Sequence, residues 1–592
     1  MTMNFATDSN ALSRQYFDPT KVIKDLDRTD ISGAKVTFVN MPIREQAKPN
    51  NAPLGPALLA ARLREFDADV GIVDLNAYRF HDEISERRGL PNRRALTFNE
   101  MEELLSRYFE KHGDQDLIAL SGLITTLEWQ EEVAKVLRRI QPLAVIASGG
   151  GLATEFRETL FKWIPSLDAV AHSEGDDVIL KMAFDAKQIR NRGMKSAVAS
   201  GSLAPYFLGM NNNRPRFLYD GGRPASLDEL PFPAWDLLES DINGFNVLEM
   251  YIGNPVWGGV AQNSSATPFS MNRSMNTVSS RGCPFECKFC FRGAQGERNY
   301  GTRSAANLAS EMQSLVERYK VDFVGIEDDN FMVNPKRIAE LVPLMKEITS
   351  GLPLSWGTHG RLDEAADLRP SSKQLNYSIS RKRLRVDDMA EAGCTYIGFG
   401  AESASERVLD AMGKGGFILK NGTTKYDGYS FPTTMTQGIE NTYNAGMHGN
   451  CTWIMGYPGE KLFDLQTTVE FIRWQEELYT SGKASGSREY EEARNSVNKA
   501  IFVATAYPGT ELFRTQSVKR KLTERLNIKF NSAGHPIPDG NLFKYVRSLN
   551  DATDIIVNET SEPLNYSDIP DDTFLEARDL IMNDNLYGIL DL

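Results

Sequence analysis

The chain has five cysteines, and three of them, Cys283, Cys287 and Cys290, lie within eight positions. They form the pattern C-x3-C-x2-C in the stretch "SSRGCPFECKFCFRG" (279–293). Structural zinc sites normally take four ligands, often as two separated pairs. Three thiolates on one loop instead suit a 4Fe–4S cluster whose fourth iron stays open for a substrate or cofactor. The spacing therefore predicts an iron–sulfur centre that takes part in chemistry.

Two other interpretations of this loop stay open on the residues alone. One is a loop of three unrelated thiols, and the other is a zinc site that takes a ligand from elsewhere in the chain. The remaining cysteines, Cys394 and Cys451, stand alone in the sequence. We expect both to be small buried packing residues. The alternative for either one is a catalytic thiol that donates hydrogen.

Composition bounds the class of protein. The chain has 592 residues, of which 41% are hydrophobic and 24% charged, so we expect several globular domains. Its net charge of −13 argues against broad contact with nucleic acid or an anionic membrane. No apolar run is long enough to predict a membrane span, and the polar N-terminus lacks the apolar centre of a signal peptide. With so few cysteines, we expect a protein of the reducing cytoplasm.

Short apolar stretches alternate with helical patterns in the first part of the chain. Strands are expected at 35–40, 69–75, 116–122, 143–151 and within 167–177, with helices at 53–66, 128–140 and 155–163. This alternation is typical of a parallel, doubly wound, Rossmann-like sheet. We expect one such α/β domain at 31–190, after a polar N-terminal segment at 1–30. Residues 191–270 are dense in Pro, Gly and Asn and are expected to form a linker.

A second alternation begins near residue 276. Strands are expected at 276–280, 321–328, 353–359, 394–403 and 450–459, with helices at 304–319, 335–348, 385–392, 435–445 and 462–474. About six strands predict a partial or full parallel (β/α) barrel at 271–500, followed by a small mixed C-terminal region at 501–592. In such barrels the chemistry lies at the carboxyl ends of the strands. The cysteine loop follows the first strand of this series.

The cysteine loop, with the aromatic Phe289 before its last cysteine, resembles the signature of the radical S-adenosylmethionine (SAM) superfamily. The stretches "GIEDDNF" (325–331), "GRLDE" (360–364), "GFGAESAS" (398–405) and "WIMGYPGE" (453–460) are similar to other elements of that family, in the same order. The resemblance implies that the three cysteines hold a 4Fe–4S cluster whose open iron binds SAM, and that SAM is cleaved to a 5′-deoxyadenosyl radical. It further implies SAM contacts at Phe289, Glu327, Asp329, Glu402, Ser403, Ile454 and Gly456. Glu460 also matches the last stretch. The alternative for the acids at 327–329 is a substrate contact or a solvated strand end.

The N-terminal domain resembles the cobalamin-binding domain that precedes one branch of this superfamily. "APLGPALLAARLRE" (52–65) is similar to its first helix, "HSEGDD" (172–177) to a later loop, and "LPFPAWDLL" (230–238) to the linker that follows. The resemblance implies cobalamin contacts at Pro53, Leu54, Gly55, Ser121, Gly122, Leu123, Gly149, Gly150, Gly151, Glu174 and Gly175. The alternative is a nucleotide-binding or purely structural flavodoxin-like domain.

This domain departs from the pattern of other cobalamin proteins in one respect. It lacks the D-x-H-x-x-G motif whose histidine binds cobalt from below, and His81 and His172 have the wrong spacing. The lower face of cobalt is therefore expected to be left to water, to nothing, or to another residue such as Arg44. In the radical branch such a cobalt would favour methyl transfer.

The resemblance implies a cobalamin-dependent radical SAM methyltransferase that methylates an unactivated carbon, or phosphorus, of a small-molecule or peptide substrate. It also implies an electron donor such as flavodoxin or ferredoxin. Cyclisation or rearrangement with the same cofactors is the alternative, and a non-enzymatic cobalamin and iron–sulfur sensor is a more remote one. A tRNA methylthiotransferase would need further cysteines before Cys283, and there are none. No nucleic-acid partner is expected.

Overall fold

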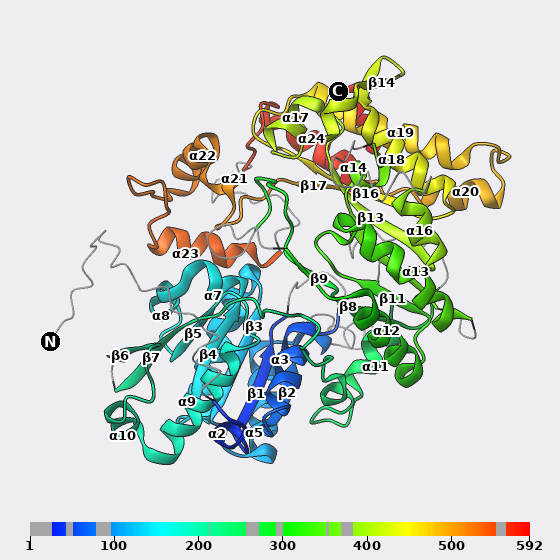
Figure 1. Ribbon diagram of the computed structural model, residues 1–592. Coiled ribbons are helices and arrows are strands. Elements are labelled where there is room, and N and C mark those ends of the chain that lie inside the picture. The colour runs from blue at the N-terminus through cyan, green and yellow to red at the C-terminus, as the bar shows by residue number, and fades with distance from the viewer. Residues whose placement is uncertain are drawn as a thin grey trace.

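The computed structural model describes residues 26–42, 51–78, 96–211, 213–255, 271–291, 300–350, 354–368, 383–551 and 564–592. Two largely parallel β-sheets lie next to one another, each flanked by helices (Figure 1). The C-terminal helices, drawn in orange and red, lie against both halves (Figure 1). The α/β fold class expected from the sequence is confirmed.

The first sheet has the strand order β2-β1-β3-β4-β5-β7-β6, and only the β6–β7 pair is antiparallel. Its strands are β1 (Lys35–Asn40), β2 (Asp69–Asp74), β3 (Leu117–Gly122), β4 (Val145–Gly150), β5 (Ala169–His172), β6 (Phe207–Asn211) and β7 (Arg214–Asp220). Its main helices are α3 (Leu54–Arg64), α5 (Phe98–His112), α6 (Leu127–Ile140) and α9 (Val178–Arg192). Val36 and Phe38 of β1 share a core with α3 and α9, whereas Val39 shares one with α5 and α6. Helices on both faces confirm the predicted doubly wound sheet.

The first sheet continues past residue 190 into the segment that was expected to be a linker. β7 is buried along most of its length and pairs with β5, and β6 adds an antiparallel edge. The sequence pattern concealed β7 because its apolar run is only Phe217 to Tyr219, between Pro215 and two glycines. The rest of the segment contains α10 (Met194–Ala199), η4 (Trp235–Leu238) and α11 (Val247–Ile252). Residue 190 is therefore not the end of this sheet.

The second sheet is parallel throughout and has the order β17-β16-β13-β12-β11-β8. Its strands are β8 (Ser274–Thr277), β11 (Phe323–Ile326), β12 (Ser355–Gly360), β13 (Cys394–Glu402), β16 (His448–Met455) and β17 (Ile501–Val503). Its main helices are α12 (Ala305–Tyr319), α13 (Pro335–Thr349), α16 (Arg385–Glu391), α18 (Thr433–Asn444) and α19 (Leu462–Thr480). Since β8 and β17 are edges, the described strands form an open, partial barrel. Its last strand lies just beyond the boundary expected at residue 500.

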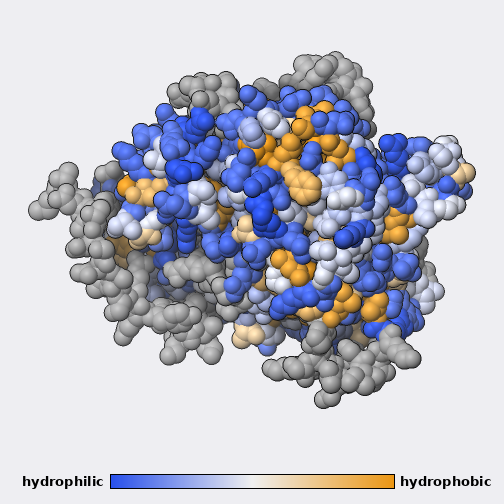
Figure 2. Space-filling view, turned by 90° about the horizontal axis from the view of Figure 1, so that it is seen from above, coloured by the Kyte–Doolittle hydropathy of each residue, from blue (hydrophilic) through white to orange (hydrophobic). Residues whose placement is uncertain are grey.

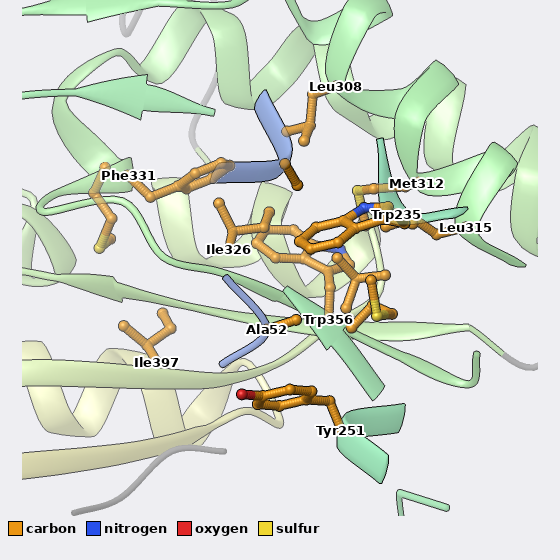
Figure 3. Packing of buried hydrophobic residues seen from close by; sticks show 14 of the residues in the cluster. Ala52, Trp235, Tyr251, Leu308, Met312, Leu315, Ile326, Phe331, Trp356 and Ile397 are labelled. Carbon is orange, nitrogen blue, oxygen red and sulfur yellow. The ribbon is translucent and has the colours of Figure 1, made fainter. Parts of the chain in front are cut away.

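One hydrophobic core joins the two sheets. Ala52, from the loop before α3, belongs to the same buried cluster as Trp356 of β12 and Leu308 of α12. Trp235 and Tyr251, from the segment that connects the sheets, belong to the same cluster (Figure 3). Burial of one large apolar side chain contributes about 1.5–3 kcal/mol. Several such side chains from both halves are buried together, so moving one sheet relative to the other would expose them at a large cost in free energy.

The C-terminal region contacts both sheets. Its helices are α21 (Glu511–Arg514), α22 (Gln516–Leu526), α23 (Gly540–Arg547) and α24 (Asp571–Met582). Arg547 of α23 forms ion pairs with Glu128 and Glu131 of α6, at 2.8 and 3.3 Å. Phe574 of α24 lies against Gly456 at the end of β16. This region therefore closes over the carboxyl ends of strands in both halves.

None of the helices in the described ranges combines the length and the apolar character that crossing a bilayer requires. Seen from above, patches of apolar residues lie among larger areas of hydrophilic residues (Figure 2). The exposed large apolar side chains include Leu123 and Phe291. Both belong to the candidate site.

The first sheet depends on a buried carboxylate that yields a testable prediction. Asp168 has no exposed surface, and it accepts hydrogen bonds from the Ile146 N–H and from the guanidinium groups of Arg138 and Arg214. Asp168→Ala removes the carboxylate that pairs with Arg138, Arg214 and Arg216, and such a loss typically costs about 3–5 kcal/mol. Denaturant unfolding should show this loss. Asp114→Ala, which removes a 63% exposed carboxylate that pairs with Arg190, should cost at most about 1 kcal/mol. Equal effects of the two changes would contradict the prediction.

Candidate active site between the two sheets

The cysteine loop begins at the carboxyl end of β8 and is held by backbone hydrogen bonds from two directions. The Lys288 N–H donates to the Met412 carbonyl at 2.9 Å, and the Lys288 carbonyl accepts from the Leu512 N–H at 2.7 Å. Upstream of the loop, Asp328 at the end of β11 accepts from the N–H groups of Ser279 and Ser280. The loop is thus fixed by a neighbouring strand end, by the segment after α17 (Glu406–Ala411) and by the C-terminal region.

The three cysteines differ in how deeply they are buried, and two positively charged side chains lie near them. Cys287 is buried, Cys283 is half-buried and Cys290 is exposed. The Arg361 guanidinium lies 3.6 Å from the Cys287 sulfur. A hydrogen bond with Cys290, together with the charges of Lys414 and Arg361, lowers the pKa of Cys287. The same hydrogen bond raises the pKa of Cys290, and burial raises the pKa of Cys283. Cys287 is therefore the thiol of the loop that ionises first, and iron is bound by thiolates.

Two cations beside the loop, Arg361 and Lys414, are buried. Arg361 also lies over the Phe285 ring, 4.0 Å from its centroid, and donates to Asp363. Lys414 donates to Glu402 at 3.0 Å. The stretch that contains Arg361 was singled out in the sequence, but its role was not predicted. No sequence signal marked Lys414.

The donor set fits a cluster better than a single metal ion. Among the described residues, no three His, Cys, Asp or Glu side chains converge closely enough to hold one metal ion. In a 4Fe–4S cluster each thiolate binds a different iron, so the sulfurs need not meet at one point. Two nearby cations offset the charge of thiolates in a partly buried loop. Three thiols on one loop with two cations beside them are a donor set that fits the iron–sulfur interpretation.

The predicted SAM residues of β13 differ in how they are placed. Glu402 has a φ of +68°, at a register shift between β13 and β16, and its carboxylate is paired with Lys414. Lys414 in turn lies 5.9 Å from the Phe289 ring centroid, so these three residues form one group beside the cysteine loop. Ser403 is fully buried, and its hydroxyl lies 3.3 Å from that of Thr468. The structure therefore turns Ser403 away from this group.

The predicted SAM residues of β16 lie at the strand's end. Ile454 is half-buried and packs against the same hydrophobic cluster as Phe289. Gly456 has a φ of +83°, and a Cβ placed there would be 2.8 Å from the Phe574 ring. Glu460 is fully buried and accepts from the N–H groups of Gly456 and Tyr457. These contacts fix the turn that follows the strand.

The three acids after β11 separate into different roles. Asp328 is buried and serves the backbone of the cysteine loop, whereas Asp329 is exposed. Glu327 lies 3.9 Å from the His359 ring of β12, measured from Oε2 to Nδ1. Burial raises the pKa of Glu327 to about 7, although a hydrogen bond from Asn51, in the first half of the chain, acts to lower it. His359 was not predicted, because a single histidine in a strand carries no pattern.

A largely apolar cavity of about 430 Å³ lies at the carboxyl edge of the first sheet. Seven of the predicted cobalamin residues line it: Leu54, Gly55, Ser121, Gly149, Gly150, Glu174 and Gly175. Of the other four, Pro53, Gly122 and Gly151 directly adjoin lining residues in the chain, and Leu123 follows Gly122. The structure thus gathers segments that are more than 100 residues apart around one space.

Glycines give this cavity its shape. Gly150 has a φ of +87°, and a Cβ there would lie 2.4 Å from the Gly122 carbonyl, so two strand ends come into contact. At Gly55 no heavy atom lies within 4 Å of an added Cβ, and at Gly149 the nearest is 3.9 Å away. Backbone at these two positions therefore borders open space in which a flat ligand could approach closely. The cavity fits a large, mostly apolar group.

No histidine is among the described residues that line the cavity. His172 is buried next to Asp220, with its Nδ1 3.7 Å from that carboxylate. His81 and Arg44 lie outside the described residues. The absence of a lower histidine ligand to cobalt therefore stays a prediction.

Comparison with known proteins identifies the second half of the chain. Residues 277–472 match the model of the Radical SAM superfamily, which confirms that resemblance for the cysteine loop and the strands that follow it. In fold, the chain is similar to the cobalamin-dependent SAM radical enzyme OxsB, solved with aqua-cobalamin and SAM bound. The TM-score is 0.58 at 15% identity, over 94% of this chain and 67% of OxsB.

Relatives by sequence include two methyltransferases and a cyclase. An uncharacterized methyltransferase of Pyrococcus horikoshii is 24% identical over 78% of this chain and 77% of its own length. Cytidylyl-2-hydroxyethylphosphonate methyltransferase of Streptomyces wedmorensis is 22% identical over the same shares. An anaerobic magnesium-protoporphyrin IX monomethyl ester cyclase of Cereibacter sphaeroides is 24% identical over 52% of this chain and 43% of its own.

The buried Glu460 makes stability depend on pH. Burial raises its pKa from 4.5 to about 8, so the folded chain keeps this carboxyl protonated at pH values where the unfolded chain ionises it. Its contribution to the free energy of unfolding therefore falls as pH rises from about 4.5 to 8, because only the unfolded state loses the proton. Glu460→Gln removes this loss. The Tm of the variant minus that of the wild type should grow from pH 5 to pH 8; a constant difference would contradict the assignment.

Proposed function

We propose that this chain, whose residues 277–472 form a radical SAM domain, is a cobalamin-dependent radical SAM methyltransferase. One observation carries the proposal: the three-cysteine loop and the glycine-lined cavity lie at the carboxyl ends of two parallel sheets that share one core. In both kinds of sheet these ends are where ligands bind. The cysteine loop and the cavity therefore lie close enough for an iron–sulfur centre and a large cofactor to act on one substrate.

Cys283, Cys287 and Cys290 would hold the 4Fe–4S cluster, which supplies the electron that cleaves SAM. Arg361 and Lys414 offset the negative charge of the thiolates. Lys414 also holds the Glu402 carboxylate beside the loop, where it is placed to accept from the SAM amino group. Phe289 and Ile454 provide apolar surface next to these polar groups.

The cavity of the first sheet would hold cobalamin, which supplies the methyl group when bound. Gly55 and Gly149 leave room for it, and Leu54 of α3 and Ser121 of β3 line the same cavity. Leu123 leaves 51% of its surface exposed at the end of β3, where an apolar ring could cover it. We propose Gly456 as a further SAM contact and the remaining predicted residues of the cavity as further cobalamin contacts. Ser403 is left out, because its buried hydroxyl faces Thr468.

The substrate would bind between the two cofactors. Glu327 and His359 lie at the ends of neighbouring strands, and Asp329 is exposed next to them. These side chains can accept and donate hydrogen bonds to a small molecule or to a peptide. An electron donor of the flavodoxin or ferredoxin type would reduce the cluster. We place the protein in the reducing cytoplasm, since it relies on free thiols.

The comparisons favour methyl transfer over cyclisation. The two methyltransferase relatives match 78% of the chain, whereas the cyclase matches 52%. Products separate these outcomes. Methyl transfer consumes one SAM to remethylate cobalamin and so yields S-adenosylhomocysteine together with 5′-deoxyadenosine. A cyclase yields 5′-deoxyadenosine alone, and a sensor yields neither.

The cysteine assignment predicts a loss of iron and of both products. Replacing Cys283, Cys287 or Cys290 by Ala should remove cluster binding, because each thiolate holds a different iron. Anaerobic reconstitution with iron, sulfide and hydroxocobalamin, followed by SAM and a strong reductant, allows iron and products to be measured together. Cys394→Ala, at a buried thiol outside the loop, should keep the iron. Normal cluster assembly in a loop variant would refute the assignment.

The cavity assignment predicts a selective loss of cobalamin. Gly149→Leu places a side chain into the open space, so bound cobalt should fall at least tenfold while iron stays unchanged. Gly540→Leu, at a glycine of α23 whose Cβ also meets no neighbour, is the matched control and should keep both metals. Cobalt and iron are measured on the purified, reconstituted proteins. Equal cobalt content in the two variants would exclude this cavity as the cobalamin site.

A further inference from the structure

The cysteine loop and the cavity of the first sheet share a wall. Val278 and Arg281, just before Cys283, line the cavity together with residues of the first sheet. On the other flank of the loop, Phe291 directly follows Cys290 and leaves 38% of its surface exposed. A Cβ on Gly151, in the glycine turn after β4, would lie 4.0 Å from the Phe291 ring. Both flanks of the cysteine triplet therefore touch the predicted cobalamin segment.

Arg281 makes the most specific contact across this wall. Its guanidinium donates to Glu174 at 2.7 Å and to both carboxylate oxygens of Asp176, at 2.6 and 3.0 Å. Arg223 binds the other oxygen of Glu174 at 2.6 Å. The side chains of Arg281, Glu174 and Asp176 are only 20%, 19% and 6% exposed. A planar guanidinium with donors on two edges can satisfy two carboxylates at once.

Each end of this ionic link is held by backbone contacts within its own half of the chain. On the first sheet, the Ser173 N–H donates to the Thr154 hydroxyl at 3.1 Å, and the Gly221 N–H donates to the His172 carbonyl at 2.8 Å. A Cβ on Gly221 would lie 1.8 Å from the Glu174 carbonyl, so β7 packs directly on this loop. In the second half of the chain, Arg281 pairs with Gly301 in a separate two-stranded ladder of β9 (Ser280–Arg281) and β10 (Gly301–Thr302). Arg281 thus connects two firmly held loops.

We propose that Arg281 is a positioning residue that couples the cobalamin cavity to the cluster loop, so that each cofactor strengthens the binding of the other. This inference rests on the proposed function. Glu174 lines the cavity and Arg281 precedes the first cysteine by two residues, so a shift in either loop disturbs the same ion pairs. Loss of Arg281 takes from the buried Asp176 the guanidinium that binds it, which is strongly unfavourable, whereas Glu174 keeps Arg223. A coupling of this kind acts equally in both directions.

The test measures cobalamin affinity with and without the cluster. Hydroxocobalamin is titrated into the full chain under anaerobic conditions, before and after reconstitution with iron and sulfide, and binding is followed by quenching of tryptophan fluorescence. In the wild type, the cluster should tighten the Kd of hydroxocobalamin at least about fivefold. In Arg281→Gln the two Kd values should agree. Arg281→Lys keeps the charge but lacks the planar fork, so it should recover only part of the difference.

Arg318→Gln is the matched control, because Arg318 binds Glu239 at 2.7 Å in an exposed pair that does not border the cavity. It should keep the wild-type difference between the two Kd values. Phe291→Ala changes the other flank of the cysteine loop, beside Gly151, and should also reduce the difference between the two Kd values. This variant decides between the outcomes if Arg281→Gln does not fold.

The outcomes separate this inference from the proposed function. A wild-type protein that binds no hydroxocobalamin in either state would refute the proposed function. A wild type that binds it equally well with and without the cluster would overturn the coupling alone. If Arg281→Gln keeps the wild-type difference between the Kd values with and without the cluster, Arg281 does not couple the two sites. If Arg281→Gln does not fold, the same result in Phe291→Ala leads to the same conclusion.

Discussion

A loop that gathers three thiol groups must be held in place by groups other than the thiols themselves. In this chain the holding groups come from remote segments: Asp328 binds the backbone before the loop, and the Met412 carbonyl and Leu512 N–H bind the backbone of Lys288. The charge of the thiolates is met by Arg361 and Lys414. The conformation of the loop therefore depends on every element that supplies one of these groups.

This constraint explains why the C-terminal region matters to the site. It follows the last barrel strand, yet it contributes Leu512 to the cysteine loop and Phe574 to the turn after β16. The same region is joined to α6 of the first sheet through Arg547. The cleft is thus closed by a part of the chain in which no chemical motif was found.

The two sheets face each other with their carboxyl ends, and polar side chains cross the boundary. Asn51 from the first half hydrogen-bonds Glu327 of the second, and Arg281 of the second binds Glu174 of the first. The shared apolar core makes these polar contacts geometrically reliable, because it prevents the sheets from sliding. A reaction that uses two cofactors at once requires such a fixed separation.

Local sequence determined much of this protein. The cysteine spacing marked the cluster loop, and β1 spans the expected range, 35–40. Seven of the residues predicted to contact cobalamin line one cavity. These features were predictable because glycine turns and alternating strands are local patterns. Only the tertiary structure decided the remaining features: β7 joins the first sheet, Ser403 turns inward, and Lys414, His359 and Arg281 reach the site. The physical reason is that periodicity reports which face of an element is buried, whereas the partner of a buried charge is chosen by packing between segments that are far apart in the chain.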